Sequence, residues 1–410
     1  MKSEEKSGKY LTSHLPGTGG VMKETPEDFR VEEIPLYAPC GEGEHVYLTF
    51  EKRGITTLEA IRRIARAAGV QERDIGYAGM KDARALTVQT VSIPRVGPDQ
   101  LMLLELPGIR TLAAVPHRNK LKLGHLAGNR FRIRVRDVAT DALPYAESVL
   151  KLLRERGIPN FFGEQRYGAQ ANSHLIGRAL LKQDYRLAVD TLIGDPSAVE
   201  DAGWRSAIEA YRSGDLVGSM AAFPRFCATE REVLKRLAAR PDDYRQAFRA
   251  VHPRLVKLYL SACQSFLFDR VLAARLEGFD RVMAGDLAWK HANGACFLVE
   301  DEAAEAPRAK AFEISPTGPM FGCRMKLPEG EPRKLEEAEL LDEGITMEQF
   351  DLPGGLRMEG ERRPLRVPIG NPSAALDAEG LLLEFSLPKG SYATAVLREV
   401  MKCASMDSGA

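Results

Sequence analysis

GYAGMKDARALTVQTVSIP, residues 76–94, is the stretch that decides how the rest of the chain can be arranged. An apolar run breaks into the polar segment KDAR at residues 81–84, and alternating apolar and polar residues resume over residues 87–92. This pattern predicts a strand, a turn and a second strand. Asp82 is then a single carboxylate on a loop between two strands, and the two cations of the polar segment favour its ionised form. An ordinary turn aspartate between solvated basic residues gives the same local pattern, so this stretch alone assigns no function.

The residues that precede this stretch predict a rigid support for the loop. Alternation predicts a short strand beginning near Phe29 and a longer strand over residues 43–53. A capping box at Thr56 and a glycine in the C-terminal cap position, Gly69, bound a helix over residues 58–68. Phe29 is either a core residue or an aromatic platform on which a base can stack. The apolar face of the helix comprises Leu58, Ile61, Ile64, Ala65 and Ala68.

Length, charge and cysteine content narrow the class of protein. A chain of 410 residues is long enough for two domains, and 57 basic against 57 acidic residues leave no net charge. Any nucleic-acid surface must therefore come from local clustering. Residues 1–20 are polar and glycine-rich, so we expect them to be mobile, and neither a signal peptide nor a membrane-spanning segment is expected. The cysteines form no metal-binding or redox pair, which indicates reduced thiols in a cytoplasmic protein: Cys40, Cys227, Cys263, Cys296, Cys323 and Cys403.

Residues 117–136, HRNKLKLGHLAGNRFRIRVR, contain seven Lys or Arg and no acid, the largest local excess of charge in the chain. The alternating end of this run places its arginines on one face of a strand and its apolar residues on the other. We interpret the run as either a track for an RNA phosphate backbone or a solvated outer face. If it is a track, neutralising two of the arginines flattens the dependence of RNA affinity on salt. The candidates for contact with the backbone are Lys120, Lys122, Arg130, Arg132 and Arg134.

An aromatic segment follows the basic run. An amphipathic pattern over residues 141–156, closed by Gly157, predicts a helix that leads into residues 158–168, IPNFFGEQRYG. Aromatic rings stack on bases, asparagine reads a base edge by hydrogen bonds, and arginine binds phosphate or carboxylate. Aromatic residues of a buried core give the same composition, so both interpretations stay open.

The second half of the chain has a different character. Residues 169–367 show helical patterns rich in Arg and Ala, which predict a separate, mostly helical domain. Within it, residues 300–307 and 326–341 are interpreted as surface loops. Residues 380–401 then predict an apolar strand, a turn in which Ser391 caps the next helix, and that helix. Such a hydrophobic strand needs a sheet, and we expect it to join the sheet of the first half, which makes the helical domain an insertion.

Several segments together resemble one protein family. AGMKDARALTVQ is similar to the signature of the TruD family of tRNA pseudouridine synthases, and further segments match in the same order: KETPEDFRVEE, GEGEH, KLGHLAGN, PNFFGEQRYG, SACQSFLF and LPKGSYATAVLRE. The resemblance runs from Lys23 to Glu399, nearly the whole chain. It implies an α+β fold, with a pseudouridine synthase core built on a mainly antiparallel curved sheet and an inserted TRUD domain. The core then comprises residues 21–168 and 368–410, and the insertion residues 169–367.

The resemblance also implies a reaction and the residues that carry it. The family isomerises the uridine at position 13 of tRNA to pseudouridine without cofactor or metal, which makes tRNA the partner, and we expect a monomer. The family's catalytic aspartate falls on Asp82. The chemistry, and not the resemblance, makes Arg166 the expected partner that keeps it charged and oriented. Tyr392 occupies a place where we expect phenylalanine often, and its hydroxyl needs a partner if it is buried. The substrate-binding positions of the family motifs fall on Phe29, Asn160, Tyr392, Phe162 and Lys23.

The chemistry agrees with these residue types. Isomerisation breaks a C–N glycosidic bond, turns the base and rejoins it through carbon, so nothing is oxidised. An ionised aspartate can attack the sugar or the base, or can remove a sugar proton in a route through a glycal, and the sequence does not choose among these. Two other classes explain part of the pattern. A non-catalytic RNA-binding module accounts for the basic strand but does not need an aspartate on a rigid loop, and a hydrolase with an aspartate nucleophile needs a second carboxylate or metal ligands beside Asp82.

Overall fold

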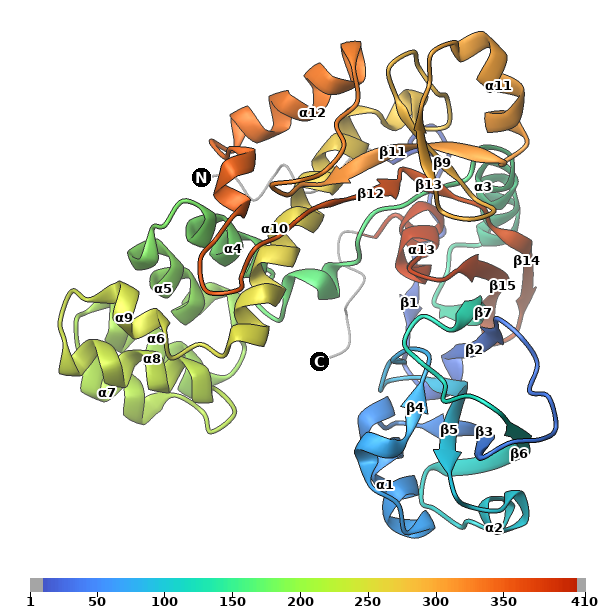
Figure 1. Ribbon diagram of the computed structural model, residues 1–410, viewed down its shortest axis with the longest axis horizontal. Helices are drawn as coiled ribbons and strands as arrows, with labels where there is room; N and C mark the ends of the chain where they lie inside the picture. The colour runs from blue at the N-terminus through green and yellow to red at the C-terminus, as the bar shows by residue number, and fades with distance from the viewer. Residues whose placement is uncertain (1–9, 404–410) are drawn as a thin grey trace. The chain divides into compact units, whose positions relative to one another are not determined.

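The computed structural model of the protein describes residues 10–403, and the chain divides into two compact units (Figure 1). Unit 1 comprises the described residues up to Ile158 and those from Val367 onward, and unit 2 comprises Pro159–Arg366. Unit 2 is therefore inserted in the sequence of unit 1. The boundary expected near Ala169 lies inside unit 2, because the aromatic segment after Ile158 already packs within the inserted unit.

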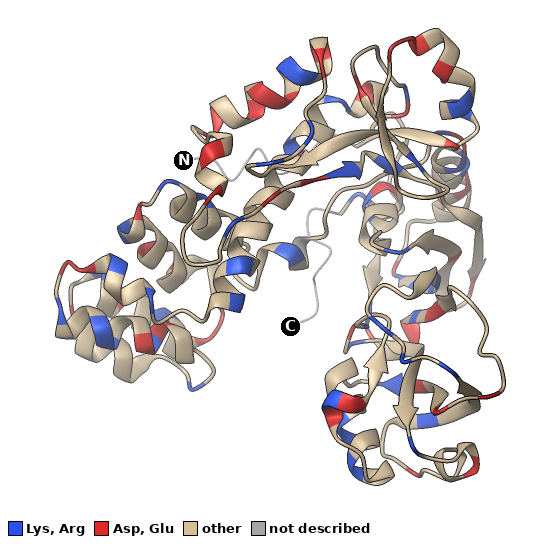
Figure 2. Cartoon of the chain, in the orientation of Figure 1, with Lys and Arg blue, Asp and Glu red and all other residues tan. Residues whose placement is uncertain are grey.

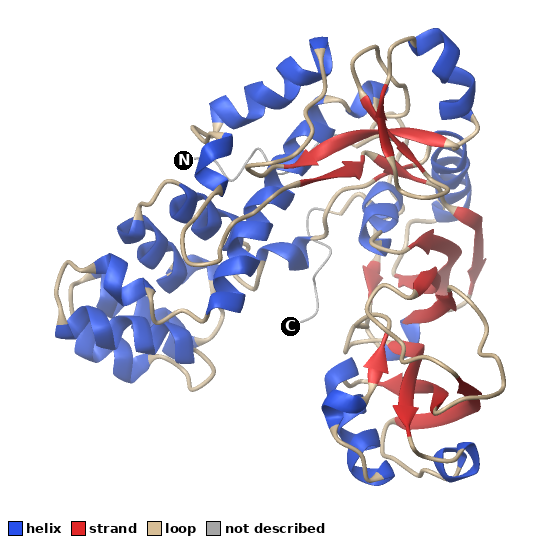
Figure 3. Cartoon of the chain, in the orientation of Figure 1, coloured by secondary structure: helices blue, strands red, loops and turns tan. Residues whose placement is uncertain are grey.

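Unit 1 is built on a nine-stranded sheet with the order β14-β15-β7-β2-β5-β3-β6, in which β1 lies beside β7 and β4 beside β5. Figure 3 draws its strands in red. The pairings are antiparallel except that of β2 with β5, so the prediction of a mainly antiparallel sheet is confirmed. The strands are β1 (Val21–Met22), β2 (Phe29–Pro35), β3 (His45–Arg53), β4 (Gly76–Tyr77), β5 (Leu86–Pro94), β6 (Ile109–His117), β7 (Leu126–Arg136), β14 (Gly370–Asp377) and β15 (Gly380–Pro388).

The C-terminal strand joins the sheet of the first half, as its hydrophobicity predicts. β15 pairs with β7, and alternate residues of both strands are buried on one face of the sheet. Each large apolar side chain buried in this way contributes about 1.5 to 3 kcal/mol. Helix α3 (Ala142–Arg156) packs against β14, and α13 (Ala393–Met401) packs against α3. The buried apolar positions of the two strands are Leu126, Phe131, Ile133, Val135, Leu381, Leu383, Phe385 and Leu387.

Helix α1 (Thr57–Ala68) packs on β3 and β5 in a second part of the core. It begins and ends as predicted, because the Thr56 hydroxyl accepts the backbone N–H of Glu59 and Gly69 adopts the left-handed conformation with φ +70°. The predicted apolar face is wrong at Leu58, which is 50% exposed. Residue 57, four positions before Ile61, is in line with the buried face, whereas residue 58 points away from it.

Unit 2 is mostly helical, as predicted, with a long central helix whose residues are part of its main core. It also contains a four-stranded sheet, order β10-β9-β11-β12, that the sequence patterns do not predict. Two short strands, β8 (Ile158–Pro159) and β13 (Arg366–Val367), pair where the chain passes between the units. The remaining elements are α4 (Ser173–Leu181), α5 (Tyr185–Ile193), α6 (Ala202–Arg212), α7 (Leu216–Ala222), α8 (Ala228–Ala239), α9 (Tyr244–Phe248), α10 (Pro253–Ala274), α11 (Glu302–Lys310), α12 (Gly330–Asp342), β9 (Leu287–Lys290), β10 (Cys296–Leu298), β11 (Ile314–Met320) and β12 (Glu361–Pro364).

Three local predictions are wrong. The segments expected to be surface loops contain helices α11 and α12, because Ala, Glu, Lys and Arg are strong helix formers whatever their charge. The carboxylate of Asp301 begins α11 by accepting the N–H groups of Ala303 and Ala304 at 2.9 and 3.2 Å. Helix α13 has Tyr392 at its N-cap and no side-chain cap, so Ser391 does not play that part.

The N-terminal segment is packed from its first described residues, although mobility was expected over residues 1–20. Leu11 and Thr12 are buried, and their backbone N–H groups donate to the Glu399 carboxylate at 3.1 and 2.9 Å. Burial of a carboxylate requires such partners, so this segment is part of the core around α13. Residues 1–9 lie outside the described residues.

Two features concern the whole chain. The six cysteines are free thiols, as predicted, and Cys227 and Cys263 are buried. No helix in residues 10–403 combines the length and the apolar character that crossing a membrane requires.

Candidate active site

Asp82 lies on the loop between β4 and β5, as the strand, turn and strand pattern predicts. The two strands pair antiparallel, with Gly76 opposite Ser92, and residues 78–85 form the loop. Glycine is required at residue 76 because a Cβ atom there would come within 2.2 Å of the carbonyl oxygen of Leu121. The strand from which the loop starts, β4, is therefore packed closely against the backbone of Leu121.

Two donors hold the Asp82 carboxylate. Oδ2 accepts from Nζ of Lys23 at 2.5 Å, and Oδ1 accepts from the backbone N–H of Arg84 at 3.0 Å. Lys23 follows β1 with φ +62°, a left-handed conformation that non-glycine residues adopt rarely and often at functional sites. Its ammonium lies 4.5 Å from the centre of the Phe29 ring, within cation–π distance. Lys23, Phe29 and Asp82 thus form one cluster in unit 1.

Asp82 is ionised at neutral pH. Burial acts to raise the pKa of this carboxyl, but the hydrogen bond and charge of Lys23, the N–H of Arg84 and the charge of Lys52 outweigh it. The pKa of Asp82 is therefore lowered from its ordinary value of 3.8. The ionised form is the one that can act as a nucleophile or as a base.

Buried polar contacts fix the backbone around Asp82. The ammonium of Lys81 pairs with Glu33 at 2.5 Å, and each of these side chains is 6% exposed. The backbone N–H of Lys81 donates to Oγ1 of Thr57 at 2.9 Å. Nζ of Lys52 donates to the carbonyl oxygen of Asp82 at 2.8 Å. The loop is therefore tied to β2, to α1 and to β3.

Sequence analysis missed two of these residues, Glu33 and Lys52. For Lys52 a signal exists, because Val46, Leu48 and Phe50 alternate along β3 and all point into the core. Lys52 continues that series and is fully buried. A lysine at an inward position of a strand is unusual and marks a residue with a specific partner. For Glu33 we find no comparable signal, because its partner comes from a distant loop.

The two aromatic residues of unit 1 that the resemblance implicates differ in exposure. Phe29 is 6% exposed, and its ring meets Phe131 edge-on with the ring centres 6.4 Å apart. It is a core residue in this structure, with the Lys23 ammonium near its ring. Tyr392 is 36% exposed at the start of α13. A stacking role for Phe29 stays a prediction that requires its ring to become accessible.

Three further predicted site residues, Asn160, Phe162 and Arg166, belong to unit 2. Asn160 is 3% exposed, with Nδ2 donating to the carbonyl oxygen of Pro364 at 2.8 Å and Oδ1 accepting from Arg363 at 2.6 Å. The Arg363 guanidinium lies 4.3 Å from the centre of the Phe162 ring. Reading of a uracil edge by Asn160 stays a prediction, and it requires the amide to exchange or share these bonds.

That Arg166 keeps Asp82 charged stays a prediction, since Arg166 belongs to unit 2 and Asp82 to unit 1. Nε of Arg166 donates to Oγ of Ser265 at 2.9 Å, and a second nitrogen donates to Oγ of Ser261 at 2.5 Å, so two hydroxyls of α10 take its donors. The cation that the structure bonds to the Asp82 carboxylate is Lys23. The family motifs assign Lys23 to substrate binding, and in the structure it is the partner of the carboxylate.

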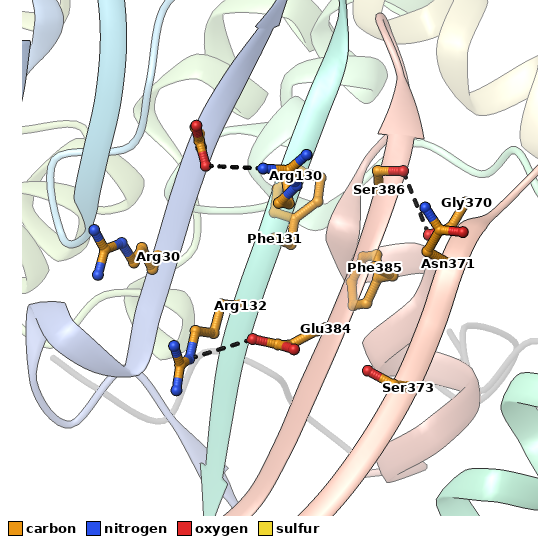
Figure 4. Close-up of a pocket in the computed structure, with 11 residues that line it drawn as sticks. Arg30, Arg130, Phe131, Arg132, Gly370, Asn371, Ser373, Glu384, Phe385 and Ser386 are labelled. Atoms are coloured by element: carbon orange, nitrogen blue, oxygen red, sulfur yellow. Dashed lines mark hydrogen bonds and ion pairs between the residues drawn. The ribbon is translucent and has the colours of Figure 1, made fainter.

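The arginines of β7 share one face of the strand, as predicted, but each is paired with an acid from a neighbouring element. Figure 4 shows the pairs of Arg130 and Arg132. Basic and acidic positions, blue and red in Figure 2, are interspersed over residues 10–403, in keeping with the zero net charge of the sequence. The basic run lacks acids of its own, yet the strands beside it supply them, which weakens its interpretation as a positive track. The pairs are Arg130 with Glu32 at 3.4 Å, Arg132 with Glu384 at 3.4 Å, Arg134 with Asp377, and Arg136 with Asp28 at 2.7 Å.

This polar face is also opposite to the one that carries Phe29. Arg30 and Glu32 alternate with Phe29 along β2, and alternate residues of a strand point to opposite faces of the sheet. Together with Arg130 and Arg132 they line a hollow of about 460 Å³. Because the Lys23 ammonium lies near the Phe29 ring, the Asp82 cluster is on the other face. The arginines therefore do not border the candidate catalytic carboxylate.

The lysines of the basic run have a different location. Their loop packs beside the Asp82 loop, since the backbone N–H of Gly124 donates to the carbonyl oxygen of Ala78 at 2.8 Å. Lys120 donates to the carbonyl oxygen of Arg73 at 2.8 Å. Lys122 is exposed and makes no ion pair with any described residue. Lys389 is also exposed and bonds to the carbonyl oxygen of Gly124 at 3.1 Å, which adds a further cation beside this loop.

The fold and this site define a class of enzyme. The structure is similar to the crystal structure of a Methanosarcina mazei protein assigned as tRNA pseudouridine synthase D, with a TM-score of 0.85, 29% identity and coverage of 98% of each chain. With its helices and mainly antiparallel sheet, the chain has the α+β pseudouridine synthase fold.

The sequence comparisons give the family. Residues 7–400 match the family model described as tRNA pseudouridine synthase D (TruD). A protein of that name from Geobacter metallireducens is 69% identical, over 96% of this chain and 98% of its own. One from Geobacter sulfurreducens is 66% identical over 98% of both chains, and one from Thermus thermophilus is 40% identical over 97% of this chain and 93% of its own. The chain belongs to the TruD family of tRNA pseudouridine synthases, and the resemblance found in its motifs is confirmed.

Proposed function

We propose that the protein isomerises the uridine at position 13 of tRNA to pseudouridine, with Asp82 as the catalytic nucleophile. The observation that supports this most directly is the Asp82 carboxylate itself, ionised and bonded to Lys23 on a loop that buried contacts hold in place. Membership of the TruD family supplies the reaction, and the names of the relatives supply tRNA as the substrate. We also propose that the enzyme acts as a monomer in the cytoplasm.

The reaction needs little beyond such a carboxylate. The bond between the ribose C1′ and the uracil N1 breaks, a bond between C1′ and C5 of the same base forms, and one proton leaves C5 while another is taken up at N1. Atoms and electrons balance without an oxidant, a reductant or a leaving group. Asp82 supplies the negative charge that attacks, and Lys23 keeps that charge in place and oriented. Capture of the separated sugar by water would compete, so the site must hold base and sugar together through the rotation.

The target uridine has to leave its stack before it can reach Asp82. Unstacking costs a few kcal/mol, and each base stacked on an aromatic side chain regains about 1 to 3 kcal/mol. In unit 1 the side chain of Tyr392 is 36% exposed, whereas Phe29 is buried. The substrate-binding roles of Asn160 and Phe162 stay predictions.

Product analysis tests the proposed function. A tRNA with tritium at C5 of its uridines, incubated with the protein, should release one tritium per molecule to water and should yield pseudouridine at position 13, because the new C–C bond displaces the C5 hydrogen. A tRNA with cytidine at that position is the matched control and should release none. Free uracil in place of pseudouridine would show a hydrolase, and binding without tritium release would show a non-catalytic RNA-binding module.

We expect tRNA affinity to depend on salt through the lysines beside the Asp82 loop more than through the arginines of β7. Replacing both Lys122 and Lys389 by Gln should flatten the slope of log affinity against log salt by about 0.7 to 0.9 for each phosphate that is no longer neutralised. Replacing Arg130 and Arg132 by Gln should change the slope less. Each of these arginines is already paired with an acid, and both lie on the face of the sheet opposite to Asp82.

Binding isotherms at four or more salt concentrations, measured for both double variants beside the unaltered protein, check this expectation. The two pairs remove the same formal charge, so each serves as the control for the other. A larger change for the arginine pair would restore the sequence-based interpretation of β7 as the phosphate track.

A further inference from the structure

Lys52 is a buried lysine whose ammonium bonds to two backbone acceptors and forms no ion pair with a described carboxylate. Its side chain on β3 is fully buried, and Nζ donates to the carbonyl oxygens of Ile55 at 2.7 Å and of Asp82 at 2.8 Å. No ion pair involves it among the described residues. One acceptor belongs to the turn that leads into α1, and the other belongs to the catalytic loop. The ammonium thus joins two segments that are separate in the sequence.

Stability alone does not account for an ammonium at this place. Removing an ionised amine from water is unfavourable, and two carbonyl dipoles compensate for the lost hydration only in part. The positions before it on the same face of β3 are Leu48 and Phe50, which pack in the core without any such demand. Lysine at this position is therefore unfavourable for folding, and a role in placing Asp82 explains its presence.

We propose that Lys52 is a positioning residue for the reaction, which fixes the backbone carbonyl of Asp82 and thereby the direction of the catalytic carboxylate. The bond acts on the peptide unit that follows the Asp82 Cα atom, and the same peptide unit carries the N–H of Ala83 into the turn. Loss of the bond lets this peptide unit rotate, and the carboxylate moves with it. The inference rests on the proposed catalytic role of Asp82.

The charges around Lys52 support this assignment. Burial is the main cause that lowers the pKa of Lys52, to about 8, with a further lowering by the charge of Lys81 and a raising by that of Asp82. From the neighbouring strands it faces Thr87 of β5 and Ile109 of β6, and neither is titratable. Near pH 8 the amine starts to lose its proton, so the charge-assisted bond to the Asp82 carbonyl weakens to an ordinary one.

The same titration has the opposite effect on stability. The unfolded chain holds this proton up to about pH 10.5 and the folded chain only up to about pH 8, so between these values the unfolded state binds more protons. The contribution of Lys52 to the free energy of unfolding therefore rises with pH in that window. If Lys52 positions Asp82, the reaction rate should fall between about pH 8 and pH 10.5, the same range in which the contribution of Lys52 to stability rises.

Lys52→Met tests the proposal, with Thr49→Val as the matched control. Thr49 lies on the same strand and loses one side-chain hydrogen bond, to Thr90 at 2.9 Å, without contact to Asp82. Single-turnover conversion at saturating protein should fall at least about tenfold in Lys52→Met, since misplacement of a reacting group by about 1 Å costs as much as a hundredfold. tRNA affinity and thermal stability should be unchanged, or stability slightly raised, and Thr49→Val should react within about threefold of the unaltered protein.

The pH profile separates positioning from a merely structural part. The unaltered protein should lose rate above about pH 8, and Lys52→Met should lack this alkaline limb. A rate within about threefold in a folded Lys52→Met, or a rate loss matched by a loss of stability, would overturn the proposal. Should Lys52→Met not fold, a flat pH profile of the unaltered protein up to about pH 9.5 would overturn the proposal as well.

The Asp82→Asn variant separates this inference from the proposed function. If Asp82→Asn reacts at the normal rate, the proposed function fails. If only Lys52→Met reacts at the normal rate, this inference alone fails.

Discussion

Asp82→Asn should convert tRNA uridine at least about a thousandfold more slowly than the unaltered protein, a loss of roughly 4 kcal/mol of transition-state stabilisation. The substitution keeps the shape of the side chain and removes the negative charge that the reaction uses. The pKa of Asp82 is lowered by its partners, so the carboxylate is ionised throughout the neutral range and the full effect should be seen at any pH from about 6 to 8.

The hydrogen bonds around Asp82 show why the amide is a poor substitute. The carboxylate accepts from Lys23 with one oxygen and from the N–H of Arg84 with the other. Asparagine has a single oxygen, so one of these two donors then faces an NH₂ group. The loss of stability should be modest, since Asp82 is partly exposed. A carboxyl with a lowered pKa stabilises the fold above its unfolded pKa and loses that contribution as the pH falls through its folded value.

Single-turnover rates for Asp82→Asn and Asp82→Ala, measured beside binding isotherms, decide this prediction. tRNA should bind equally well or slightly tighter, because removal of the negative charge reduces repulsion of phosphate. Asp377→Asn is the matched control: its carboxylate is also ion-paired, with Arg134, but on the opposite face of the sheet. Rates within about tenfold of the unaltered protein in both Asp82 variants would move the catalytic role to another residue.

Local sequence patterns predicted the parts of unit 1 that depend on near neighbours. The strand, turn and strand around Asp82, the limits of α1 and the joining of β15 to the sheet follow from alternation, capping and hydrophobicity, which act over a few residues. In unit 2, helices α11 and α12 were not predicted, although they too depend on near neighbours. Their charged residues suggested surface loops, but the same residues have high helix propensity.

The contacts at the candidate site that sequence analysis did not predict share a different cause. The acids that pair with Arg130 and Arg132 come from β2 and β15, so they become neighbours only through the strand register. Periodicity within one strand does not give that register. Likewise Lys23, 59 residues before Asp82, becomes its partner because β1 pairs with β7 and ends beside Phe29. Partners of a charge are decided by tertiary pairing, so sequence motifs alone did not give the bond between Lys23 and Asp82.

Lys23→Met should have the second largest effect, about a hundredfold loss of rate near pH 6. Methionine preserves the length of the side chain and the contact with the Phe29 ring, but it removes the hydrogen bond and the charge at 2.5 Å from Asp82. A partly buried carboxylate without that partner is less well oriented. It is also more basic, because the burial that raises its pKa is no longer outweighed to the same extent.

The pH profile distinguishes Lys23→Met from a variant that merely weakens substrate binding. In the unaltered protein the pKa of Asp82 is already low, so the rate should be flat between about pH 5 and pH 7. In Lys23→Met the pKa rises, a fraction of Asp82 is protonated at the acid end, and the rate should climb with pH as that fraction ionises. Lys23→Arg, which keeps the positive charge, is the control and should restore a flat profile even if its rate is lower. A profile for Lys23→Met that runs parallel to that of the unaltered protein would mean that Lys23 does not set the ionisation of Asp82. The remaining loss would then come from orientation alone, and Arg84 and Lys52 would be sufficient to hold the carboxylate charged.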